Sequence, residues 1–71
     1  MDRISILNSN GIIREVYCVP LRTSPYRYAG DLVRRHRHAG LVYDYIIEVS
    51  GQEPQLASGD LVLTKEMLAC G

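Results

Sequence analysis

The sequence predicts a small α+β protein in which a single amphipathic, arginine-rich helix packs on one face of a small antiparallel sheet. Two observations support this prediction. Residues 24–40 show a helical apolar period and carry most of the positive charge, whereas the remaining chain is rich in β-branched runs and alternating patterns. We therefore expect one small domain, residues 1–71, whose elements follow in the order ββαββ.

A helix is predicted over about residues 25–39. Ser24 is a suitable N-cap, Pro25 suits the first helical position, and Gly40 provides the stop. Gly30 lies inside the pattern and weakens it by about 1 kcal/mol relative to alanine, so regular helix is expected to start near Ala29 or Gly30. One stripe at helical spacing faces the core: Ala29, Leu32, Val33 and His36.

A β-hairpin is predicted over residues 3–19, because two β-branched runs flank the segment NSNG, and Asn-Gly is a strong turn signal. A two-residue turn would mix buried and exposed faces, so we favour a three-residue loop with Gly11 left-handed, which pairs Leu7 with Ile13 and Ile4 with Val16. The core face then has one polar member, Arg14. Its other members are Ile4, Ile6, Ile12, Val16 and Cys18.

After the helix, residues 41–49 alternate strictly and predict a strand. Residues 50–60 contain two glycines and a proline and predict a loop, which is long for so small a domain. Residues 61–64 predict a short strand, followed by either a frayed continuation or one helical turn capped by Thr64. Either hairpin leaves an open sheet edge that a partner or a second copy could extend.

The cysteines and the apolar runs exclude several classes of protein. Cys18 and Cys70 show no C-x-x-C spacing, so neither a disulfide framework nor a zinc site is predicted. His36 and His38 form an H-x-H pair whose rings diverge on a helix, which argues against a shared metal, and we expect no cofactor. The chain has no apolar leader and no run of membrane-spanning length, so we expect an intracellular, cytoplasmic protein.

Charge is balanced overall, with eight basic and eight acidic side chains, but it is distributed unevenly. Residues 20–40 hold five arginines against Asp31, whereas residues 41–71 hold five acidic residues against Lys65. Such a dipolar chain can steer toward a charged partner, or its halves can attract each other within the fold or across a homodimer. Within the helix, Asp31 can pair with Arg34 or Arg35.

The polar side of the helix is the predicted partner-binding surface, which we call the basic helix face: Arg27, Arg34, Arg35, Arg37 and His38. Four tyrosines are candidate aromatic anchors: Tyr26, Tyr28, Tyr43 and Tyr45. The alternative for the charged residues is a solvated face balanced by acidic neighbours. For the tyrosines it is core packing, in a chain that has neither Phe nor Trp.

From these features we predict a non-enzymatic binding module that docks on a larger macromolecule, most often a protein, as an inhibitor or adaptor. One origin that we consider for such a chain is a phage or mobile element, with the host machinery as its target. An alternative is nucleic-acid binding by the basic helix face. A second alternative is a small metal-independent ribonuclease or toxin, with His38 or His36 as acid and base and Arg34 or Arg37 stabilising the transition state.

Overall fold

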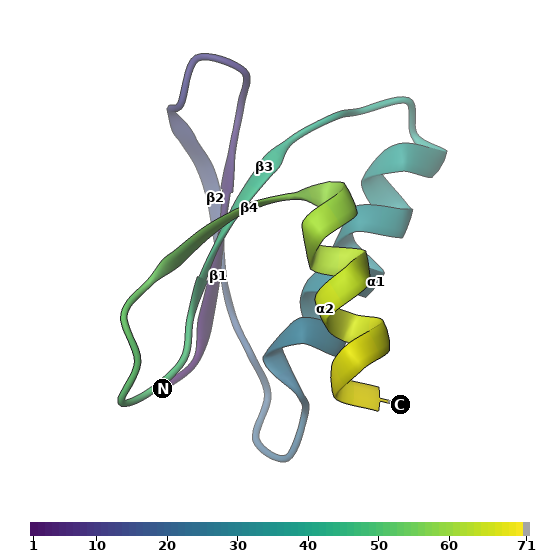
Figure 1. The fold of residues 1–71 in the computed structure, drawn as a ribbon. Coiled ribbons are helices and arrows are strands. Elements are labelled where there is room, and N and C mark those ends of the chain that lie inside the picture. Colours follow the sequence, from purple (N-terminus) through teal and green to yellow (C-terminus); the bar gives the residue numbers. More distant parts are fainter. Residues whose placement is uncertain (71) are drawn as a thin grey trace.

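The computed structural model describes residues 1–70 and shows a four-stranded antiparallel sheet with two helices on one of its faces (Figure 1). The strands are β1 (Arg3–Leu7), β2 (Ile13–Cys18), β3 (Asp44–Glu48) and β4 (Gln55–Ser58), and the helices are α1 (Pro25–His38) and α2 (Gly59–Cys70). The sheet order β2-β1-β3-β4 places β1 and β3 at the centre. An α+β fold is thus confirmed, with a second helix that the ββαββ order lacks. Neither helix is long and apolar enough to cross a membrane.

Helix α1 forms almost as predicted. The Ser24 side chain accepts a hydrogen bond from the Arg27 backbone N–H at 3.4 Å, and Pro25 opens the helix. At the other end Gly40 has φ +77°, and the Leu41 N–H donates to the His36 carbonyl at 2.9 Å, which satisfies a terminal carbonyl. Regular helix begins at Pro25, so the expectation of a later start is wrong.

Gly30 has a packing role that explains a glycine inside a helix. A Cβ atom at this position would lie 2.6 Å from the Glu66 Oε1 atom of α2, which is far inside van der Waals contact. The missing side chain therefore leaves room for the Glu66 carboxylate in the position where it meets Arg34.

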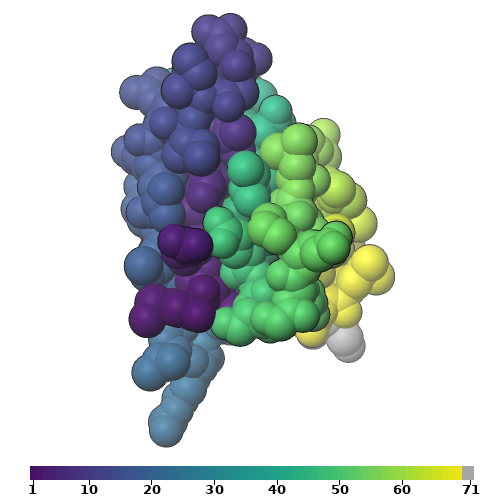
Figure 2. All heavy atoms as spheres, turned by 90° about the vertical axis from the view of Figure 1, so that its left-hand side faces the viewer, coloured from purple at the N-terminus to yellow at the C-terminus, as the bar shows by residue number. Residues whose placement is uncertain are grey.

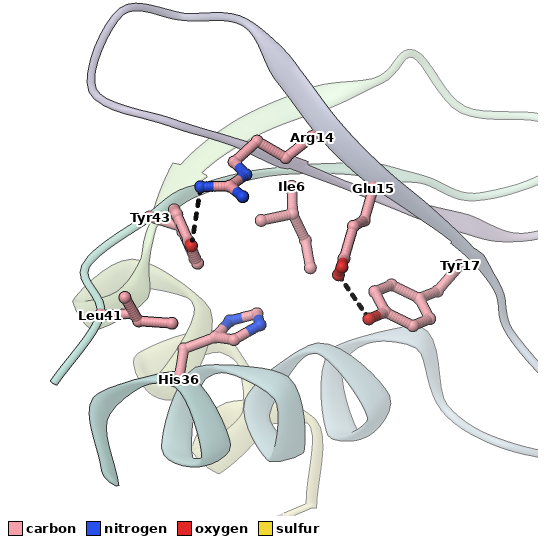
Figure 3. Close-up of a pocket in the computed structure, with 7 residues that line it drawn as sticks. All are labelled: Ile6, Arg14, Glu15, Tyr17, His36, Leu41 and Tyr43. Carbon is pink, nitrogen blue, oxygen red and sulfur yellow. Dashed lines mark hydrogen bonds between the residues drawn. The ribbon is translucent and has the colours of Figure 1, made fainter. Parts of the chain in front are cut away.

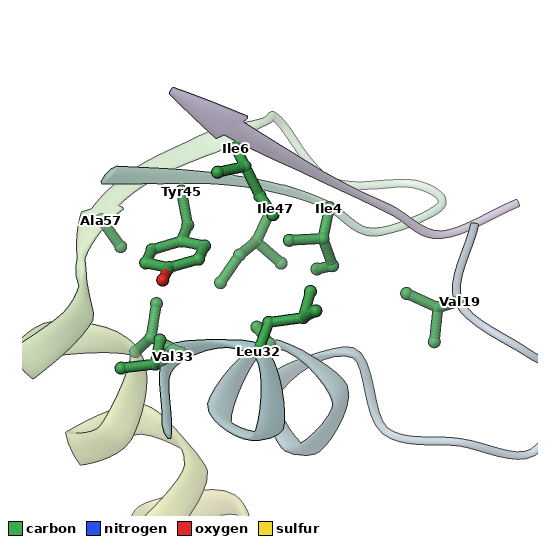
Figure 4. Packing of buried hydrophobic residues seen from close by; sticks show 10 residues of the cluster. Ile4, Ile6, Val19, Leu32, Val33, Tyr45, Ile47 and Ala57 are labelled. Atoms are coloured by element: carbon green, nitrogen blue, oxygen red, sulfur yellow. The ribbon is translucent and has the colours of Figure 1, made fainter. Parts of the chain in front are cut away.

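The core lies between the sheet and the helices (Figure 4). Leu32 and Val33 of α1 face Tyr45 and Ile47 of β3, and all four side chains are at most 2% exposed. The predicted apolar stripe of α1 is therefore confirmed, with His36 half-buried at its end, and the strand predicted over residues 41–49 forms over the shorter range Asp44–Glu48. The buried cluster consists of Ile4, Ile6, Val19, Ala29, Leu32, Val33, Tyr45, Ile47, Ala57 and Val62.

The predicted register of the first hairpin holds only next to the turn. Gly11 is left-handed and Leu7 pairs with Ile13, as predicted, but a bulge then makes Arg14 an extra residue, and Ile4 pairs with Tyr17 rather than Val16. A bulge of one residue moves every later side chain of its strand to the opposite face. The expected core positions of Val16 and Cys18 are consequently wrong, and both side chains are exposed. Ile12, which lies before the bulge and before the start of β2, is also exposed rather than in the core.

The C-terminal prediction is also corrected. Strand β4 forms within the segment 50–60 that was predicted as a loop, and residues 61–64 are helical rather than extended. The Ser58 side chain accepts from the Leu61 backbone N–H at 3.3 Å, so the last residue of β4 acts as the N-cap of α2. The strand thus passes directly into the helix. For residues 65–70 the prediction left open a continued strand or one helical turn capped by Thr64. The structure shows helix there, but Thr64 lies inside α2 and is not its cap.

Candidate functional site

Part of the basic helix face is occupied by the chain itself. The Arg34 guanidinium bonds both carboxylate oxygens of Glu66, at 2.7 and 3.0 Å, and also Asp31 at 2.6 Å. These bonds raise the pKa of Arg34, and they lower the pKa of Glu66. The predicted pairing of Asp31 within α1 is confirmed for Arg34. Attraction between the basic and acidic halves therefore acts within the fold.

Arg37 is engaged in the same way, because its guanidinium lies 2.7 Å from Asp60 in the first turn of α2. The other three members of the basic helix face, Arg27, Arg35 and His38, are exposed and form no ion pair within residues 1–70. The predicted surface is thus divided. Arg34 and Arg37 form ion pairs with α2, whereas Arg27, Arg35 and His38 form none within residues 1–70.

The tyrosines lie closer to the alternative of core packing. Tyr45 is 1% exposed, so the proposal that it anchors a partner is wrong. Tyr26, Tyr28 and Tyr43 are half-buried and pack against the edge of the core. Tyr28 lies near Tyr17, with ring centroids 6.4 Å apart.

A pocket of about 330 Å³ opens between β2 and α1, and we call it the β2–α1 pocket (Figure 3). The bulge in β2 directs Arg14 and Glu15 toward it, and Tyr43, just before β3, closes one side. An Arg14 nitrogen donates to the Tyr43 hydroxyl at 3.4 Å, and the Tyr17 hydroxyl donates to Glu15 at 2.5 Å. Its lining residues are Ile6, Arg14, Glu15, Tyr17, His36, Leu41 and Tyr43.

His36 forms the wall that α1 contributes to this pocket. Its Nδ1 atom lies 2.9 Å from the Tyr45 hydroxyl, so the histidine of the apolar stripe is half-buried and hydrogen-bonded. Burial lowers the pKa of His36, the positive charge of Arg35 lowers it further, and the negative charge of Glu15 acts in the opposite direction. The arginines named for the ribonuclease alternative, Arg34 and Arg37, face α2 instead, and the structure does not bring them together with His36.

Neither helix covers the opposite face of the sheet, which Figure 2 shows from the front. We call it the open sheet face. The register aligns one residue from each strand in a row across it: Val16, Ser5, Ile46 and Leu56. A second row begins with Ile13 and Leu7. Val16 and Ile13 are each 53% exposed and Leu56 is 67% exposed, whereas Ser5 is buried beneath its larger neighbours.

Charged residues border the open sheet face. The Arg3 guanidinium bonds the Glu48 carboxylate at 2.9 Å, on one side of the row that contains Ser5 and Ile46. Asp44 lies on the other side of this row, opposite Leu7. Such an apolar centre with a polar rim is typical of protein interfaces. Sequence reasoning missed this surface because it assigned Val16 to the core and Leu56 to a loop.

Metal binding finds no support in the described part of the chain, where no three His, Cys, Asp or Glu side chains gather. Cys18 is a free, exposed thiol on β2, and the side chain of Cys70 lies outside the described residues. Comparisons of the whole chain with models of protein families, with curated proteins and with solved structures each gave no match.

Proposed function

We propose that this chain is a small non-enzymatic binding module that docks on a larger protein through the open sheet face, as an inhibitor or adaptor. The observation that supports this proposal is the row Val16, Ser5, Ile46 and Leu56, in which three strands present apolar side chains on one face around the buried Ser5 of β1. Covering such surface gains about 25 cal/mol for each Å² removed from water.

The size of the face favours a larger partner over a second copy. Four strands about 4.8 Å apart, each with about five residues at 3.3 Å, give a footprint of roughly 320 Å². A stable interface buries about 800 Å² on each partner, so two copies stacked face to face would fall short, even allowing for surface corrugation. A larger protein can extend past this face onto the rim and the β2 edge.

The sheet edges add a second element of recognition. β2 and β4 each have one unpaired side within residues 1–70. The bulge at Arg14 interrupts the free edge of β2, and β4 has only four residues, so neither edge offers a long template for an added strand. We therefore assign the principal contact to apolar side chains rather than to backbone pairing.

Two charge-introducing variants test this proposal. Val16→Glu and Leu56→Glu each place a carboxylate in the apolar row, and Val42→Glu is the matched control on a loop, where Val42 is 84% exposed. We expect both row variants to weaken capture of the partner from lysate by about tenfold or more, and the control to leave it within twofold. Thermal unfolding followed by circular dichroism confirms that all three variants are folded.

The result is decisive in both directions. Equal capture by Val16→Glu, Leu56→Glu and the control would exclude the open sheet face as the contact. Nuclease treatment tests the nucleic-acid alternative. If the captured material is lost on nuclease treatment and its binding weakens steeply with salt, the contact is a nucleic acid bound by the exposed cations Arg27, Arg35 and His38. Sedimentation of the purified protein at several concentrations tests for a homodimer.

A further inference from the structure

The β2–α1 pocket gathers polar atoms that have no partner within residues 1–70. Arg14 uses one nitrogen for Tyr43, which leaves its other N–H groups uncommitted, and the Tyr43 hydroxyl accepts that bond and keeps its own proton to donate. If the Tyr45 hydroxyl donates to Nδ1 of His36, the ring carries its proton on Nε2, on the side away from Tyr45. Arg14 and Tyr43 therefore bring uncommitted donors to one cavity, and the Nε2-protonated tautomer of His36 adds a third.

One acceptor faces these donors. The Oε2 atom of Glu15 accepts a hydrogen bond from the Tyr17 hydroxyl, and the other carboxylate oxygen has no hydrogen-bond partner in the described chain. Figure 3 shows Glu15 and Arg14 side by side on β2, across the pocket from His36. A ligand that satisfies the pocket thus needs several acceptor oxygens near Arg14 and at least one hydroxyl or N–H donor near Glu15.

The lining charges of the pocket balance, because Arg14 is its one cation and Glu15 its one anion while His36 is neutral. The preference for a phosphate therefore rests on the uncommitted hydrogen-bond donors of Arg14 and Tyr43 rather than on net charge. The apolar part of the lining is small and consists of Ile6 and Leu41 together with the tyrosine rings.

We propose that the β2–α1 pocket binds a small phosphate monoester of a polyol, of the sugar-phosphate class. The tetrahedral oxygens of a phosphate can meet donors that approach from β2, from α1 and from Tyr43, whereas a planar carboxylate fits one fork. The Glu15 carboxylate accepts from a ligand hydroxyl. The pocket volume of about 330 Å³ is at the lower end for ligand sites, which suits a single sugar ring. The proposal is independent of the open sheet face.

Titration of the protein with ribose 5-phosphate, inorganic phosphate and ribose tests this site. We expect ribose 5-phosphate to bind at least about tenfold more tightly than either fragment, because only the whole ligand reaches both Arg14 and Glu15. The two histidines provide an internal control in the NMR spectrum. The imidazole signals of His36 should shift on binding, whereas those of the exposed His38 should not.

A matched pair of variants assigns the contact. Arg14→Gln should weaken ribose 5-phosphate binding about tenfold or more, and Arg27→Gln, which removes the same charge from an exposed site on α1, should change it less than about twofold. Glu15→Ala, which removes the acceptor, should weaken ribose 5-phosphate but not inorganic phosphate. Absence of binding up to about 10 mM ligand, equal losses in Arg14→Gln and Arg27→Gln, or shifts confined to His38 would each overturn the proposal.

Discussion

The two flanks of α1 carry similar side chains but have different environments. On the flank toward α2, Arg34 and Arg37 form ion pairs with Glu66 and Asp60, although both side chains stay about half exposed. On the flank toward β2, His36 opens onto a pocket, and Arg35 has no ion pair among residues 1–70. Neighbouring residues of one basic run therefore differ in their surroundings: Arg34 and Arg37 are paired with acidic side chains, and Arg35 is not, within the part of the chain that the structure describes.

This difference shows that a charge run in a helix is not one surface. Successive side chains are rotated by about 100°, so the run from Arg34 to His38 points in several directions, and the position of the second helix decides which charges are neutralised. The following four substitutions test how far the two flanks differ.

The largest effect is expected where both flanks depend on the same anchor. Leu32 is 2% exposed beneath the sheet, and Leu32→Ala should lower the free energy of unfolding by about 2–5 kcal/mol. A chain of this size has little more stability than that, so both flanks would be lost together. Urea unfolding followed by circular dichroism measures the change. Leu68→Ala, at a position 79% exposed, is the control and should stay within about 0.5 kcal/mol.

The next effect concerns the open flank. Tyr45→Phe removes the hydroxyl that lies 2.9 Å from His36 Nδ1 and should cost about 1 kcal/mol, because a half-buried ring nitrogen loses its partner. The same unfolding experiment measures this cost. A variant as stable as the original protein would show that the bond does not hold His36 in place.

The flank toward α2 should give a pH dependence. The hydrogen bond from Arg34 lowers the pKa of Glu66, so the pair stabilises the fold above the ordinary carboxyl pKa, and this contribution is lost as the pH falls through the lowered value. Glu66→Gln should reduce stability at neutral pH by about 0.5–1 kcal/mol and flatten the acid limb of the stability profile. Unfolding at a series of pH values measures this. Glu53→Gln, in the exposed β3–β4 loop, should retain the limb.

The smallest effect is expected on the open flank. Arg35→Gln should change the free energy of unfolding by less than about 0.5 kcal/mol, because Arg35 is exposed and forms no ion pair in the described chain. Arg34→Gln, by contrast, should cost about 1 kcal/mol, since it leaves Glu66 and Asp31 without their partner. Equal losses in the two variants would remove the distinction between the flanks.

The sequence was sufficient for α1 because its signals are local. Ser24 and Pro25 define the start, and the stripe around Leu32 defines the buried side. The bulge in β2 was harder to predict, although Arg14, the one polar member of the expected core face, was its signal. With Arg14 as an extra residue, Glu15 and Tyr17 lie opposite the buried Ile6 and Ile4, and the apolar Val16 lies on the exposed face, so the hydrophobic pattern alone favoured the wrong register.

Helix α2 was missed for another reason. Its apolar residues are spread around the helix, and the β-branched Val62 beside two leucines is equally typical of a strand. Ser58 followed by Gly59 and Asp60 is a helix-start signal that could have decided the question. Both candidate sites rest on features that were not predicted, because the bulge shapes the β2–α1 pocket and β4 forms part of the open sheet face.

The direct junction of β4 and α2 has a mechanical consequence. Because Ser58 both pairs with Asp44 in the sheet and caps the helix, no slack separates the two elements. Detachment of α2 from the core would therefore also disturb the pairing of β4 with β3. We expect the two elements to open together as one unit.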